Sequence, residues 1–87
     1  MKKIKISKVD KDRLMMATKK IIGQMQSIAA IIDSDQITDQ TFIQLLAVKG
    51  GASKICKEII SKGVLKNLKD YTPEEIDNAL NIIFKLA

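Results

Sequence analysis

The sequence lacks several of the residue types on which enzymes and metal sites depend. It contains no histidine and no tryptophan, and only one cysteine and one proline occur among its 87 residues. The single cysteine excludes an internal disulfide framework. There is no imidazole to act as a base, no other nucleophile stands at a suitable spacing from a base, and KGGASK lacks the spacing of a phosphate-binding P-loop. We therefore expect neither an enzyme nor a bound cofactor.

Long apolar runs are also missing. No segment is apolar over the length of a membrane-spanning helix, and the basic start MKKIKISKVDKDR never becomes the continuous apolar segment of a signal sequence. The reducing cytoplasm is the expected location. Hydrophobic residues still make up 46% of the chain and aromatic residues only 3%, a composition typical of one small, helical, globular domain.

No linker, repeat or strand alternation divides the chain. Residues 1–87 are expected to form a single helical domain, with residues 1–9 as a basic, flexible N-terminal arm. A core of this size is marginal by itself, and no disulfide can support it. Oligomerisation is therefore expected.

The net charge of +5 is unevenly distributed along the chain. Residues 1–32 carry +6 and residues 49–69 carry +5, whereas residues 33–48 and 70–87 carry −3 each. Two basic blocks favour a polyanionic partner, most simply nucleic acid. A solvated, lysine-rich surface is the alternative, because fourteen of the fifteen cationic residues are lysine.

Apolar residues at three- and four-residue steps predict a first helix from near Asp10 to near Asp33. Asp10 is the candidate N-cap, and Val9 and Leu14 are placed to pack together at the helix start. The predicted apolar stripe consists of Leu14, Thr18, Ile21, Ile22, Met25, Ile28, Ala29 and Ile32.

Two further helix starts can be read from capping signals. Thr38 is a candidate cap for the second helix, with Ile37 and Phe42 placed to pack across its first turn. The third helix begins in YTPEEI, where Thr72 caps, the proline takes the first helical position and Glu75 completes a capping box.

Gly50 and Gly51 lie in the middle of the second helix. Each glycine costs about 1 kcal/mol relative to alanine inside a helix, but the apolar residues keep their phase across the pair at roughly 100° per residue. We therefore predict one helix from Thr38 to about Val64, too long for a compact 87-residue monomer to cover. The glycines are expected to leave bare backbone for close approach by DNA or a second subunit.

Cys56 and three methionines raise the question of a reactive thiol or a copper site. Cys56 shares one sector of the second helix with neighbouring isoleucines and is interpreted as a small buried hydrophobe rather than a reactive thiol. Met15, Met16 and Met25 are interpreted as core filling rather than as copper ligands.

The runs IIGQMQSIAAIIDSDQ and FIQLLAVKGGASKICKEI, followed by a capped acidic third helix, make the chain resemble the CsoR/RcnR family of small bacterial repressors over about residues 10–86. Gly23-Gln24, and Gln44 followed by AVKG, carry the resemblance most strongly. Members of that family sense copper, nickel or cobalt, formaldehyde or persulfides. The resemblance implies an all-α chain with long antiparallel helices 1 and 2 plus a short helix 3. It also implies a four-helix-bundle dimer, a homotetramer made from two dimers, and operator-DNA binding that is relieved when the sensor site is occupied.

The sensor ligands of that family are missing at the matching positions. The resemblance places them at Thr38, Gly63 and Asn67, and none of these residues is a credible ligand for a soft metal or for nickel. We therefore expect a divergent member without the usual metal site.

The DNA-contacting positions match better. The resemblance places basic residues at Lys19, Lys20 and Lys49, and Lys54 and Lys57 extend the basic flank of the second helix. Lysines neutralise phosphates as point charges, so the affinity for DNA should fall steeply with salt.

Two positions depart from the family pattern. Ala17 and Ile22 stand where the family usually carries cations. The predicted function is a DNA-binding transcriptional repressor, and the alternative is a helical oligomerisation or interaction module that does not bind DNA.

Overall fold

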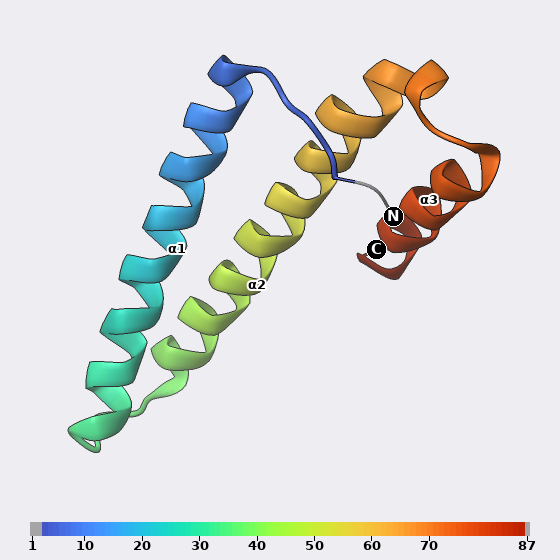
Figure 1. Cartoon of the computed structure of the whole chain (residues 1–87). Coiled ribbons are helices and arrows are strands. Elements are labelled where there is room, and N and C mark those ends of the chain that lie inside the picture. The colour runs from blue at the N-terminus through green and yellow to red at the C-terminus, as the bar shows by residue number, and fades with distance from the viewer. Residues whose placement is uncertain (1–2, 87) are drawn as a thin grey trace.

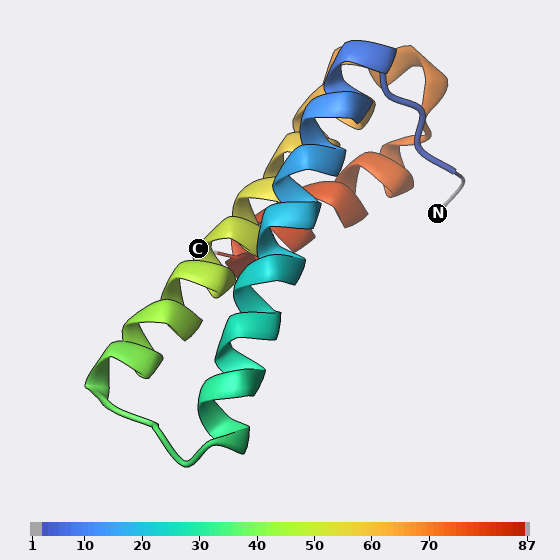
Figure 2. The same cartoon turned by 90° about the vertical axis from the view of Figure 1, so that its left-hand side faces the viewer.

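The chain folds into a long two-helix hairpin with a third helix packed near one end. The computed structural model describes residues 3–86. α1 and α2 run antiparallel side by side, and α3 folds back against the C-terminal half of α2 (Figure 1; Figure 2). The predicted all-α architecture, with three α-helices of which the first two are long and in contact, is confirmed. The elements are α1 (Lys8–Asp33), α2 (Asp39–Ile59), the π-helical turn η1 (Ile60–Val64), the 3-10 helix η2 (Leu65–Asp70) and α3 (Pro73–Leu86).

The first helix begins before the predicted residue. Ser7 is the N-cap, and its Oγ accepts a hydrogen bond from the backbone N–H of Asp10 at 3.2 Å. The prediction that Asp10 caps the helix was therefore wrong, because the serine three residues earlier takes that role. The predicted packing of Val9 was wrong too, since its side chain is 76% exposed. The predicted end at Asp33 is confirmed.

The second helix passes through both glycines without a break. A Cβ built on Gly51 would lie 3.3 Å from Cδ1 of Ile21, so the bare backbone there allows α1 to pack closely. A Cβ on Gly50 would meet nothing within 4 Å. The predicted single helix is confirmed, although its last turn, from Ile60 to Val64, takes the wider π-helical form.

The start of α3 matches the predicted capping box. The backbone N–H of Thr72 donates to Oε1 of Glu75 at 2.9 Å, and the backbone N–H of Glu75 donates to Oγ1 of Thr72 at 3.2 Å. Pro73 is the first residue of the helix, where its missing N–H costs nothing.

We expect the variant Thr72→Ala to lower the free energy of unfolding by about 1 kcal/mol, because the first turn of α3 loses its side-chain acceptor. Urea denaturation at a fixed protein concentration measures this change. Thr72→Ser keeps the hydroxyl and should remain within a few tenths of a kcal/mol of the unchanged protein. Equal stability of the alanine and serine variants would contradict the assigned cap.

The N-terminal segment packs against the C-terminal half of the molecule. Ile60, Val64 and Ala79 form a buried cluster, and Ile4 and Cys56 are among the partly buried residues packed against it. The cysteine therefore packs against apolar residues, but it is half-buried rather than buried as predicted. Lys8 and Val9, expected in the arm, belong to α1, whereas residues 1 and 2 lie outside the described part of the chain.

The inward faces of α1 and α2 follow a seven-residue repeat. We call these positions the seam, because they are buried or half-buried where the two helices meet. Glycine at residue 51 lets the helices approach closely beside the seam. The seam consists of Leu14, Ile21 and Ile28 on α1 and of Thr41, Val48 and Ile55 on α2.

Large apolar side chains remain exposed one and four residues after the seam positions on both helices. Because the helices are antiparallel, an equal offset in residue number places both sets on one side of the hairpin. We call this the apolar side. Its large residues are Met15, Ile22, Met25 and Ile32 on α1 and Phe42 and Leu45 on α2.

The apolar side corrects one prediction about the core. Met15, Met16 and Met25 are between 43% and 73% exposed, so the interpretation that they fill the core of the chain was wrong. The apolar stripe predicted on α1 is wide enough to pack against α2 and against a second surface at the same time. Its seam residues pack against α2, whereas Ile22, Met25 and Ile32 remain between 43% and 51% exposed.

A single copy is elongated and has little core. Its radius of gyration is 16.1 Å, against about 12 Å for a compact domain of this length. Only five apolar residues among those described are buried. Within residues 3–86, no helix is both long and apolar enough to cross a bilayer.

Candidate nucleic-acid interface

A groove runs between α1 and α2 on the side of the hairpin opposite the apolar side. Its lining residues stand mainly one residue before or three residues after the seam positions, which places them across the hairpin from the apolar side. The groove has a volume of about 390 Å³. It is lined by Arg13, Ala17, Lys20, Ile21 and Gln24 from α1 and by Ala47, Gly51, Lys54, Ile55 and Glu58 from α2.

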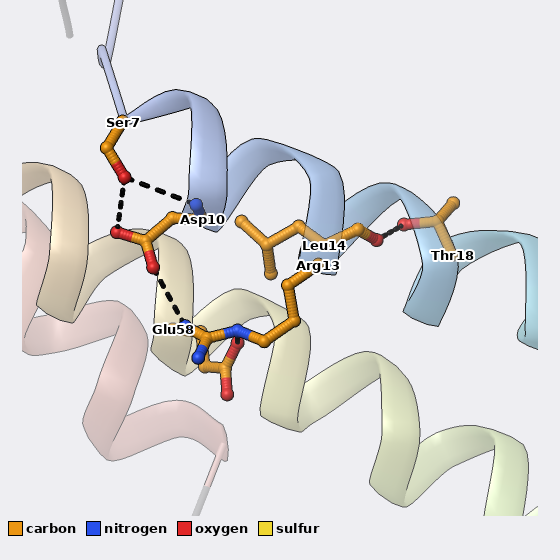
Figure 3. A network of polar contacts seen from close by, with 6 residues as sticks. All are labelled: Ser7, Asp10, Arg13, Leu14, Thr18 and Glu58. Atoms are coloured by element: carbon orange, nitrogen blue, oxygen red, sulfur yellow. Dashed lines mark hydrogen bonds and ion pairs between the residues drawn. The ribbon is translucent and has the colours of Figure 1, made fainter.

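One end of the groove is closed by an ion pair between the two helices. The Nη2 atom of Arg13 lies 2.9 Å from Oδ1 of Asp10, and its Nε atom lies 3.8 Å from Oε2 of Glu58 (Figure 3). The arginine side chain is 53% exposed, so the pairs orient the guanidinium more than they stabilise the fold. Its charge is thus partly compensated by two carboxylates.

The two lysines on the groove walls remain uncompensated. Lys20 comes from α1 and Lys54 from α2, and both are exposed. Within residues 3–86, neither forms an ion pair. The folded chain therefore holds two unpaired positive charges on opposite walls of one groove, near the partly compensated charge of Arg13.

The structure separates the five lysines predicted to contact DNA. Lys20 and Lys54 share the groove, and Lys19 and Lys57 are exposed on the outer flanks of the same helices. Lys49 follows the seam residue Val48 directly and therefore lies on the apolar side. It is about 140° from Lys54 around α2.

A second hollow continues the groove toward the loop between α1 and α2. It has a volume of about 420 Å³ and shares Lys20 and Gln24 with the first. Gln44 and Gly23, two residues that carry the family resemblance, also line it. Part of the resemblance in sequence, Gly23, Gln24, Gln44 and Ala47, thus lies on one continuous surface.

The three positions matched to sensor ligands carry a hydroxyl, a hydrogen and an amide in place of thiolate or imidazole. Thr38 is the N-cap of α2 and lies at the opposite end of that helix from Gly63 and Asn67. Cγ2 of Ile4 lies too close to residue 63 for a Cβ to fit there without a shift. The amide Nδ2 of Asn67 donates to the backbone oxygen of Gly63 at 3.2 Å. No thiolate or imidazole is available at any of these positions, so they do not fit a soft metal.

Elsewhere, too, the described residues include no group of three or more histidine, cysteine or acidic side chains that could hold a metal ion.

Sequence reasoning missed three residues that shape these surfaces. Arg13 and Glu58 pair across the helices, and Ile4 covers Gly63. The only signal for the pair of Arg13 and Glu58 was the position of the single arginine, seven residues before Lys20 on the same face of α1. No local pattern indicated that the N-terminal segment would fold back onto η1.

Comparison with known proteins supports the family suggested by the sequence. Residues 10–85 match the family model described as metal-sensitive transcriptional repressor. The match spans all of the hairpin loop, α2 and η1 and nearly all of α1 and α3. Comparison with curated proteins gives no match, and comparison with solved structures gives none either.

Proposed function

This chain belongs to the family of metal-sensitive transcriptional repressors, whose members are not enzymes, and from this premise we propose that it represses transcription by binding double-stranded operator DNA. The observation that carries the proposal is the pair of uncompensated lysines on the groove walls. A bacterial protein that binds operator DNA acts where the chromosome lies. This proposal therefore agrees with the cytoplasmic location expected from the sequence.

The proposed DNA surface is the groove side with its flanks. Lys20 and Lys54 lie at its centre, and Lys19 and Lys57 extend it outward on α1 and α2. Such side chains contact phosphates without reading bases, so they supply affinity and register. Lys49 lies on the apolar side, away from this surface. It contacts the same duplex only if the arrangement of a second subunit places that side next to the DNA.

We also propose that the apolar side is covered by a second copy of the chain, as a four-helix-bundle dimer, and that two dimers form a tetramer. Exposed apolar side chains on both helices of the hairpin support this assembly, as does the small core of a single copy. Because the groove lies on the opposite side, dimerisation leaves it open to DNA.

Repression in this proposal does not respond to soft metals at the three matched positions. Their side chains offer a hydroxyl and an amide at most. We expect titration with Cu(I) or Ni(II) to leave DNA binding unchanged. Release of DNA by a stoichiometric amount of either metal would contradict this part.

The test is selection of bound fragments from the organism's own DNA by the purified protein, followed by affinity measurements at several salt concentrations. We expect the logarithm of the affinity to fall linearly with that of salt. In Lys20→Glu plus Lys54→Glu, the slope should decrease by about 2 for each contacting subunit, because each lost phosphate contact contributes about 0.9.

A matched control carries the same charge change elsewhere. Lys66→Glu plus Lys69→Glu alters two exposed lysines of η2, which do not line the groove. It should keep most of the affinity. Equal losses in both double variants would remove the groove from the proposal. An intact oligomer that binds no DNA at low salt would instead favour the interaction module. The missing cations at Ala17 and Ile22 support that alternative.

A further inference from the structure

The floor of the groove has a chemistry that DNA binding leaves unused. Ala17, Ile21, Gly51 and Ile55 form it, all of them half-buried. Phosphate oxygens are attracted to the lysines on the walls, whereas an apolar floor provides no hydrogen bond or charge for a phosphate. A surface that served DNA alone would need only the rim.

We propose that this groove binds a small organic anion that has an apolar body and one or two negative charges. Its volume of about 390 Å³ lies within the ordinary range of small-molecule sites. The apolar body would cover the floor. The carboxylate, sulfonate or phosphate group would lie between Lys20 and Lys54, the two lysines of the groove lining, neither of which forms an ion pair within residues 3–86.

The charges around the groove select the sign and the number of charges that the ligand carries. Arg13 is held by Asp10 and Glu58, so it closes one end without adding a full free charge. The two wall lysines then match a monoanion or dianion, and a cation would meet unfavourable potential. At the other end, Gln24 can hydrogen-bond a polar substituent, because it lines both the groove and the adjoining hollow.

Occupation of the groove would regulate the proposed repressor. The ligand would engage the same two lysines that the proposed DNA surface uses, so the ligand and DNA compete. At a ligand concentration ten times its dissociation constant, the apparent affinity for DNA should fall by about tenfold by mass action. This regulatory part rests on the proposed function, whereas ligand binding itself does not.

Three probes separate the contribution of the apolar body from that of the negative charge. 2-Naphthoate has both an apolar body and a charge, naphthalene-2-carboxamide has the body alone, and inorganic phosphate has the charge alone. In NMR titrations of the full chain, 2-naphthoate should saturate and shift the amide signals of groove residues on both helices. The other two probes should bind at least about tenfold more weakly. Equal binding of the carboxamide would overturn the anion assignment, and equal binding of phosphate would overturn the role of the floor.

Variants test the location. Ala17→Leu fills the floor without changing charge and should abolish naphthoate binding. Lys20→Gln plus Lys54→Gln should weaken naphthoate at least about tenfold. If naphthoate instead shifts signals of Ile22 and Phe42 on the apolar side, or still binds Ala17→Leu, the proposal is wrong.

The DNA measurement distinguishes the failure of regulation from the failure of the proposed function. Naphthoate that saturates the groove without weakening a DNA complex that depends on Lys20 and Lys54 would overturn regulation. A protein that binds naphthoate in the groove but no DNA would overturn the proposed function and leave the ligand site standing.

Discussion

We expect Ile22→Glu plus Leu45→Glu to convert the proposed dimer into monomers. Ile22 on α1 is 51% exposed in the single chain and Leu45 on α2 is 37% exposed, and both lie on the apolar side. In the proposed dimer each substitution occurs twice, so four carboxylates would be buried without partners. Each buried, unpaired charge costs several kcal/mol. We expect the dissociation constant to rise by at least about a thousandfold, since every 1.4 kcal/mol corresponds to a factor of ten.

Sedimentation equilibrium at a fixed protein concentration measures this change. Gln36→Glu plus Gln40→Glu adds the same two charges at exposed positions that lie outside the apolar side, and it should leave the oligomer intact. An assembled Ile22→Glu plus Leu45→Glu protein would show that another surface holds the subunits together. So would equal dissociation of the control.

Gly63→Leu destabilises the fold by about 3 kcal/mol, whereas the same change at Gly50 does not. Gly63 is buried, and the first added carbon would clash with Cγ2 of Ile4. Overpacking of this kind typically costs about 1 to 3 kcal/mol and occasionally more. At Gly50 a Cβ meets nothing within 4 Å, and leucine improves helix propensity by up to about 1 kcal/mol. Urea denaturation of the two variants should therefore give changes of opposite sign.

A third variant identifies the cause of the instability. Ile4→Ala combined with Gly63→Leu makes room for the new side chain, so it should be more stable than the sum of the two single changes predicts. Additive effects, or equal stability of both leucine variants, would contradict the observed packing of the N-terminal segment. Gly50→Leu has a second use, because weaker DNA binding or a smaller oligomer in it would show that a partner needs bare backbone there.

Local features of the chain were predicted well from residue patterns. The capping box of Thr72 and Glu75 has the predicted hydrogen bonds, and α2 continues through Gly50 and Gly51 as the phase of its apolar residues indicated. Both depend on neighbours within a few residues. The start of α1 was misjudged because Ser7 and Asp10 are both good caps, and the pattern alone does not rank them.

The candidate site was predicted only in part for a physical reason. Residue type identifies Lys20 and Lys54 as cations, but their positions on opposite walls of one groove depend on how α1 and α2 are rotated against each other. The same rotation places Lys49 on the other side of the hairpin. A wide apolar stripe permits more than one rotation, so periodicity does not choose among them.

By itself, the sequence determined the helical class, the continuity of α2, the cap of α3, the family and the lack of soft-metal ligands at the matched positions. These follow from composition and from interactions over one or two helical turns. Only the tertiary structure decided which half of the α1 stripe is used within the chain, that Ile4 covers Gly63, and that two free lysines enclose an apolar floor. The last two features join residues 59 and 34 positions apart, and tertiary packing selects such pairs where no local pattern records them.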